Sequence, residues 1–133
     1  MAERMSPREF RARREALGLS RQQLATVLGN RMDTVVDWEQ GRERTPIPYG
    51  IRDELSRVEF EMAATIDDLA DWARTTQDAN TGWLLQVVNH YQNAIQLYGW
   101  RWWRCCCVRA YGDQPIPDEL LSVPESWPNP SAE

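Results

Sequence analysis

The sequence predicts a mainly α-helical fold, and three features of its 133 residues lead to this class. Helix-capping residues precede apolar residues at helical spacing at several places before residue 41. A single apolar stripe then continues at helical spacing for about 23 residues beyond Pro48. Aromatic residues at helical spacing fill the region before residue 112. We therefore expect a helical N-terminal domain, a long helix, and a small helical C-terminal region with one short strand.

The first helix is expected to run from Pro7 to about Leu17. Ser6 can cap it, Pro7 suits the first helical position, and Glu9 completes a capping box. Gly18 then ends the helix, because glycine accepts the left-handed backbone that follows a helix.

A second helix is expected over residues 21–28, because Ser20 and Gln23 repeat the capping-box pattern. Gly29 permits a sharp turn directly after it. Asn30 can then cap a third helix that runs to about Gln40.

The third helix presents Val35 and Trp38 on one face, which we expect to lie in the core. Two short helices joined by a tight turn are typical of a helix-turn-helix, whose second helix can enter the major groove of DNA.

A longer helix is expected to begin at Tyr49 or Gly50. Its apolar stripe consists of Ile51, Leu55, Val58, Met62, Ile66, Leu69 and Ala73. A helix of this length exceeds what a small domain can cover. Its far half is expected to pack on the C-terminal part of the same chain or on a second subunit, and both alternatives remain open.

The region after the long helix gives a mixed prediction. Residues 75–82 suggest a loop, and the composition of residues 83–88 favours a short buried strand, although helical spacing continues through Tyr91 and Tyr98. We expect the strand, then helical turns to Tyr98, a break at Gly99 and a helix over residues 100–111.

Three segments are expected: a helix-turn-helix domain at 1–48, a packing or dimerisation region at 49–112, and a tail at 113–133. The tail holds five Pro, five acidic residues and no basic residue, so it is expected to be extended or mobile. A few apolar residues of the tail, among them Leu120 and Trp127, could still dock locally on the rest of the protein.

Residues 6–46 resemble the helix-turn-helix of phage repressor and Cro-type regulators, also called the XRE family. The matching residues are Arg14, Gly18, Leu19, Ser20, Leu24, Ala25, Leu28, Gly29, Val35, Trp38, Glu39, Gly41 and Pro46. The resemblance implies binding to double-stranded DNA and a partly buried, bidentate ion pair between Arg14 and Glu39. The long helix and the tail resemble, more loosely, small uncharacterised bacterial proteins of this layout.

The same resemblance assigns the residues that would face DNA. The start of the second helix supplies Arg21 and Gln22, and Arg31 leads into the third helix. Its base-reading positions are Met32, Asp33, Thr34 and Asp37. Arg21, Arg31, Arg42 and Arg44 could each neutralise a phosphate, whereas phosphates repel the two acids.

The charge is unevenly distributed, although the net charge is −5. Residues 1–57 hold eleven Arg against nine acids, while residues 58–133 hold four Arg against eleven acids. Nucleic acid would therefore meet the N-terminal part. Every basic residue is Arg, which is typical of a GC-rich genome such as that of an actinobacterium or one of its phages.

Other functional classes lack their signatures in this sequence. The three Cys are consecutive and point in different directions, and His90 is the only histidine, so no metal site is expected. No phosphate-binding loop or catalytic triad is evident, and we expect neither an enzyme nor a cofactor. The chain has no apolar run of eighteen residues and no signal-peptide core, which favours a cytoplasmic protein without a membrane partner.

Two functions follow from these observations. The first is a sequence-specific transcriptional regulator that binds an inverted-repeat operator as a homodimer. The second is an interaction protein of the same fold, similar to an anti-repressor or antitoxin, that binds another protein and not duplex DNA. Trp100, Trp102 and Trp103 are candidates for a protein interface, because Trp and Arg are enriched at interface hot spots; at least one of them is expected in the core.

Overall fold

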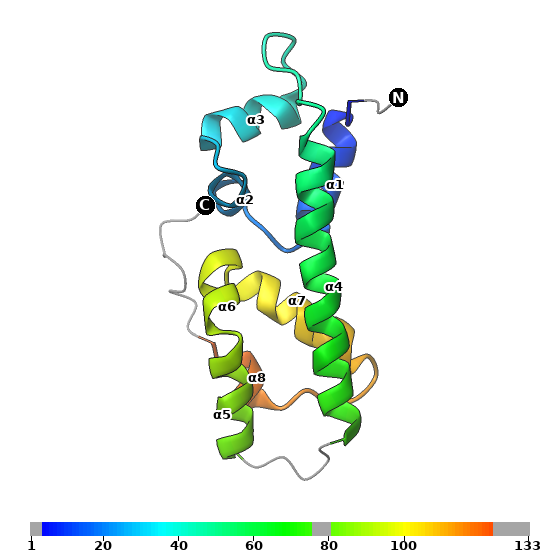
Figure 1. The fold of residues 1–133 in the computed structure, drawn as a ribbon, viewed down its shortest axis with the longest axis vertical. Coiled ribbons are helices and arrows are strands. Elements are labelled where there is room, and N and C mark those ends of the chain that lie inside the picture. Colours follow the sequence, from blue (N-terminus) through cyan, green and yellow to red (C-terminus); the bar gives the residue numbers. More distant parts are fainter. Residues whose placement is uncertain (1–3, 76–80, 124–133) are drawn as a thin grey trace. The chain divides into compact units, whose positions relative to one another are not determined.

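The chain forms two compact units that share one long helix, as described for residues 4–75 and 81–123 by a computed structural model (Figure 1). Unit 1, Met1–Glu61, contains α1 (Pro7–Ala16), α2 (Arg21–Leu28), α3 (Met32–Gln40) and the first part of α4 (Ile51–Thr75). Unit 2, Met62–Pro130, contains the rest of α4, then α5 (Thr81–His90), α6 (Gln92–Tyr98), α7 (Trp100–Tyr111) and α8 (Asp118–Leu121). The predicted mainly helical fold is confirmed.

Local capping explains where α1 begins and ends. The Glu9 backbone N–H donates to Ser6 Oγ at 3.1 Å, and Pro7 occupies the first turn. The helix ends at Ala16, one residue before the expected end, because Leu17 serves as its C-cap.

The start of α3 differs from the prediction, because Arg31 and not Asn30 is its N-cap, and no side chain caps it. Asn30 instead completes the end of α2. Its backbone N–H donates to the Ala25 carbonyl at 2.9 Å, and its side chain donates to the Leu28 carbonyl at 3.2 Å.

The core of unit 1 draws on all four of its helices. Phe10 of α1, Leu24 of α2, Val35 of α3 and Leu55 of α4 are fully buried. α1 lies beside the first part of α4 (Figure 1), so this part of α4 packs against the helices of the helix-turn-helix domain.

Ion pairs also connect α1 to α4. Arg13 Nε donates to Glu59 Oε2 at 2.9 Å, and Arg52 donates to both carboxylate oxygens of Glu9, at 2.8 and 3.3 Å. We call Glu9, Arg13, Arg52 and Glu59 the α1–α4 brace.

The far half of α4 packs on the C-terminal part of the same chain. The Tyr91 hydroxyl donates to Asp68 Oδ2 at 3.0 Å, and the Trp72 and Tyr91 rings meet edge to face at 6.0 Å. Leu69 and Met62 of the stripe are buried, and Arg109 of α7 contacts Met62 Sδ at 3.5 Å. Packing within the chain therefore covers at least part of the stripe.

The predicted strand over residues 83–88 is wrong, because these residues belong to helix α5. The buried residues Val87, Tyr91, Ile95 and Tyr98 continue one helical stripe across α5 and α6. A strand here would also leave its backbone hydrogen-bonding groups unpaired, because the described residues contain no strand with which it could pair.

In the first half of the tail, the structure confirms the alternative of local docking at Leu120 and not an extended or mobile segment. Leu120 and Val123 are buried, and the Trp103 indole N–H donates to the Leu120 carbonyl at 2.7 Å. Apolar contact and this hydrogen bond fix α8 to unit 2. Residues 124–133, including Trp127, and residues 76–80 of the expected loop lie outside the described residues.

Candidate nucleic-acid interface

A capping box fixes the start of α2, and a glycine sets the turn between α2 and α3. The Gln23 N–H donates to Ser20 Oγ at 3.1 Å, and the Ser20 N–H donates to Gln23 Oε1 at 2.9 Å. Gly29 has a φ of 71°, a left-handed conformation that favours glycine. Gly29 therefore sets the direction in which the chain leaves α2 for α3.

The inner face of α3 anchors the helix to the rest of unit 1. Val35 and Trp38 are buried, and the Trp38 ring meets the Phe10 ring edge to face at 5.6 Å. Trp38 is therefore a core residue and not a DNA contact. The exposed side of α3 carries Asp33, which the periodicity of the helix places opposite the core, and the partly exposed Asp37 lies one turn further along.

The implied ion pair between Arg14 and Glu39 is present and is bidentate. Arg14 donates from Nε to Glu39 Oε2 at 2.6 Å and from NH2 to Oε1 at 3.1 Å. Arg14 also donates to the Leu19 carbonyl at 2.9 Å, so a buried cation is well satisfied.

Arg21 belongs to the same group. Its Nε donates to Glu39 Oε1 at 3.1 Å, and 34% of its side chain is exposed. Glu39 thus binds one buried and one partly exposed guanidinium. The structure places Arg21 in a structural network, whereas the sequence suggested only a contact with DNA.

The two aspartates of α3 each have an arginine partner. Asp33 pairs with Arg31 at 3.3 Å, and Asp37 pairs with Arg42 at 3.1 Å. Arg42 also donates to Gln40 Oε1 at 2.7 Å. Each carboxylate therefore has a cation that offsets its repulsion of phosphate.

The remaining predicted DNA contacts lie on the surface of unit 1. Arg44 is exposed and has no hydrogen bond or ion pair to the part of the chain that the structure describes. Met32 and Gln22 are also exposed, and Gln22 donates to Thr26 Oγ1 at 3.3 Å. Thr34 is half-buried.

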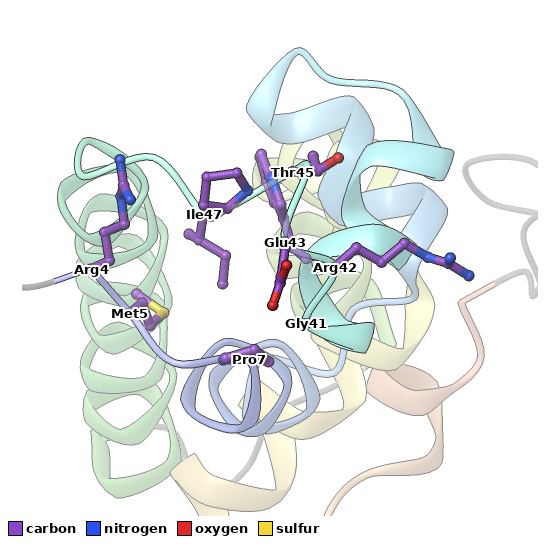
Figure 2. A pocket seen from close by; sticks show the side chains of 10 residues that line it. Arg4, Met5, Pro7, Gly41, Arg42, Glu43, Thr45 and Ile47 are labelled. Atoms are coloured by element: carbon purple, nitrogen blue, oxygen red, sulfur yellow. The ribbon is translucent and has the colours of Figure 1, made fainter.

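A hollow of about 210 Å³ lies beside the loop that follows α3. Met5, Pro7, Trp38 and Ile47 supply its apolar walls. Figure 2 shows that the Arg42 side chain points away from Met5 and Pro7, toward the outside of unit 1. The hollow is smaller than the roughly 300–1,000 Å³ of typical ligand pockets. The side chain of Arg42, a predicted DNA contact, is therefore directed to the surface of this loop and not into the hollow.

The three tryptophans proposed for a protein interface do not share one environment. Trp102 and Trp103 are fully buried and fill the core of unit 2, so they cannot form a surface in this fold. Trp100 is half-buried, and the Arg104 and Arg101 guanidinium groups lie 4.6 and 5.2 Å from its ring centroid. Only Trp100 remains a candidate contact.

The cysteines lie on α7 and point in different directions. Cys106 and Cys107 are buried, and burial raises the pKa of Cys107 to about 12. A thiol with so high a pKa is a packing group at neutral pH. Within the described residues, no cluster of three or more His, Cys, Asp or Glu could hold a metal ion. No helix in the same residues is long and apolar enough to cross a membrane.

Comparison with known families decides what the first three helices are. Residues 10–47 match the family described as Helix-turn-helix, and the match runs from within α1 to the loop after α3. This segment is a helix-turn-helix of the XRE type. No curated protein and no solved structure matches the chain. The helix-turn-helix places unit 1 among DNA-binding regulatory domains.

Sequence reasoning missed the acid–arginine pairs around this helix-turn-helix. The pairs Arg31–Asp33 and Asp37–Arg42 join an aspartate within α3 to an arginine just outside one of its ends. The short sequence separation between these opposite charges was the available signal. It could be used only once the residue at which α3 ends was known.

Proposed function

We propose that this protein is a sequence-specific DNA-binding transcriptional regulator that acts as a homodimer on an inverted-repeat operator. The observation that carries the proposal is that α3 has one buried face and one exposed face. Val35 and Trp38 hold its inner face in the core, while its outer face is open and flanked by Arg31 and Arg42. A helix held in this way can enter the major groove.

Dimerisation would bring two recognition helices onto one face of the duplex, about 34 Å apart. Phe60 of α4 is our candidate for a contact between subunits, because it is a large apolar residue and is 76% exposed. Sedimentation of the protein alone and with duplex tests this part. We expect two protomers per operator duplex, and a monomer in both samples would contradict the dimer.

Binding to a random duplex over a range of salt concentrations tests the DNA interface. We expect a dissociation constant in the micromolar range at low salt and a steep loss of affinity as salt rises. Changing Arg42 or Arg44 to Ala should weaken binding to all sequences and reduce the salt slope by about one for each phosphate contact.

Arg101→Ala provides the control, because Arg101 is an exposed arginine of unit 2. It should leave the slope unchanged. If Arg44→Ala also leaves the slope unchanged, Arg44 does not contact phosphate.

The alternative is an interaction protein that retains the fold and binds another protein. Asp33 and Asp37 on the outer face of α3 favour it, because acids repel the phosphate backbone. The half-buried Trp100 between two arginines would suit such a contact. No binding to duplex at low salt would support this alternative and contradict the regulator.

A further inference from the structure

Asp33 lies on the exposed side of α3, opposite its buried face, and Asp37 is a partly exposed residue one turn further along the helix. Successive residues of an α-helix are rotated by about 100° about the helix axis, so side chains four residues apart point in nearly the same direction. The buried Val35 and Trp38 mark the inner face, and Asp33 lies on the opposite side. If α3 enters a groove with this side first, both carboxylates reach base edges.

Their ion pairs allow this approach. The Asp33 side chain is 78% exposed and that of Asp37 is 35% exposed, and each pairs with an arginine at one end of α3. A guanidinium has five donors, so Arg31 and Arg42 can keep these pairs and still contact a phosphate. Asp33 is thereby compensated while it stays largely exposed, and Asp37 is compensated while it stays partly exposed.

The chemistry of the carboxylate limits which base it can accept. An ionised carboxylate only accepts hydrogen bonds. In the major groove, guanine offers two acceptors at N7 and O6, and thymine offers an O4 acceptor, so both repel it. Adenine has a donor next to an acceptor, which suits an amide better. Cytosine offers the N4 amino donor and is the best match.

We propose that Asp33 and Asp37 each recognise a cytosine, and that these cytosines lie about two base pairs apart in each operator half-site. The spacing follows from the helix, because four residues rise about 6 Å and each base step along a strand is about 3.4 Å. This inference rests on the proposed function, since it names the bases that the same interface reads.

Selection from a random duplex library tests the proposal. The full-length protein, Asp33→Asn and Asp37→Asn are each used to enrich duplexes at low salt, and the enriched sites are sequenced. For the wild type we expect two cytosines per half-site at the stated spacing. In each Asn variant, one of these positions should change from cytosine to adenine, because Asn suits the N6 and N7 atoms of adenine.

Affinity measurements on one selected site give the magnitude. Replacing either cytosine should weaken wild-type binding about tenfold, within the usual cost of one mismatched base pair. Asp37→Ala should lose the preference for cytosine without gaining one for adenine. Asp53→Asn is the control. It removes the same charge from an exposed residue of α4, so it should leave the base preference unchanged.

Two different failures can be told apart. Enriched sites that lack the paired cytosines, or Asn variants that select the same bases as the wild type, would overturn this inference and leave a DNA-binding regulator. If the wild type enriches no duplex even at low salt, the proposed function fails and this inference fails with it. A gain in affinity for all sequences in Asp33→Asn and Asp37→Asn, with no change of base, would also overturn it.

Discussion

Glu39 connects two arginines of different burial, and this makes it the central polar residue of unit 1. Its carboxylate accepts hydrogen bonds from Arg14 and from Arg21, and only 3% of its side chain is exposed. Removing one partner of a buried ion pair leaves the other charge without compensation. The network therefore controls the geometry of the helix-turn-helix more than a single surface pair could.

We predict that Glu39→Gln lowers the free energy of unfolding by about 3 kcal/mol, because the buried Arg14 loses its counter-charge. Urea unfolding measures this change. Glu43→Gln is the matched control, since Glu43 is exposed and should change stability by no more than about 0.5 kcal/mol. A loss below about 1 kcal/mol for Glu39→Gln would show that the pair is poorly coupled.

At the scale of elements, short helices are held in place by their ends and by contacts between helices. The capping box fixes where α2 begins, and the left-handed Gly29 sets the turn that leads to α3. The α1–α4 brace then ties α1 to the first part of α4. Two predictions test these devices separately.

We predict that Gly29→Ala lowers the free energy of unfolding by about 1 kcal/mol, because a side chain disfavours the left-handed backbone. A Cβ at this position would meet no atom within 4 Å, so the cost is one of backbone conformation alone. Gly50→Ala is the control, because its Cβ also meets nothing and no left-handed φ applies there. Thermal and urea unfolding should show Gly50→Ala equal to the wild type or slightly more stable.

The brace should give stability a pH dependence that involves Glu9. The hydrogen bond from Arg52, with further help from Arg13, holds the pKa of Glu9 below its ordinary 4.5. A lowered folded-state pKa stabilises the protein above the unfolded value, and this contribution is lost as pH falls through the folded-state pKa.

The comparison of wild type with Glu9→Gln isolates this residue, because the other carboxylates are the same in both proteins. We expect the difference in unfolding free energy to be largest near neutral pH and to shrink as the pH is lowered below about 4.5. Urea unfolding at successive pH values measures it. A difference that stays constant from neutral to acid pH would contradict a charged Glu9 in the brace.

At the scale of the whole molecule, the chain divides into a DNA-binding unit and a second helical unit. Each has a core of its own, with Phe10 and Leu55 in unit 1 and Trp102 and Trp103 in unit 2. The acidic excess of the chain lies in its second half, away from the arginines of the helix-turn-helix along the sequence. DNA affinity should therefore depend on local charge more than on the net charge.

We predict that Leu120→Ala destabilises unit 2 by about 2–5 kcal/mol, because Leu120 is fully buried. Hydrogen exchange should show faster exchange in α5, α6 and α7 and a smaller change in α1, α2 and α3, since each unit has its own core. Uniform loss of protection over the whole chain would mean that both units unfold together.

The sequence by itself determined most helices of this protein, because the signals for them are local. Ser6, Ser20 and Gly29 act through neighbouring backbone groups, and apolar spacing along α4 reports one helix face. The ion pair of Arg14 with Glu39 came from resemblance to the XRE family. The positions that would face DNA could be named in the same way, but their partners could not.

Only the tertiary structure decided the features that depend on residues distant in the chain. It made 83–88 part of a helix because that segment continues a stripe buried in unit 2, and it fixed Leu120 through the Trp103 indole. It also bound Arg21 to Glu39. Composition and spacing cannot rank such choices, because burial and ion pairing are settled by which surfaces meet when the whole chain folds.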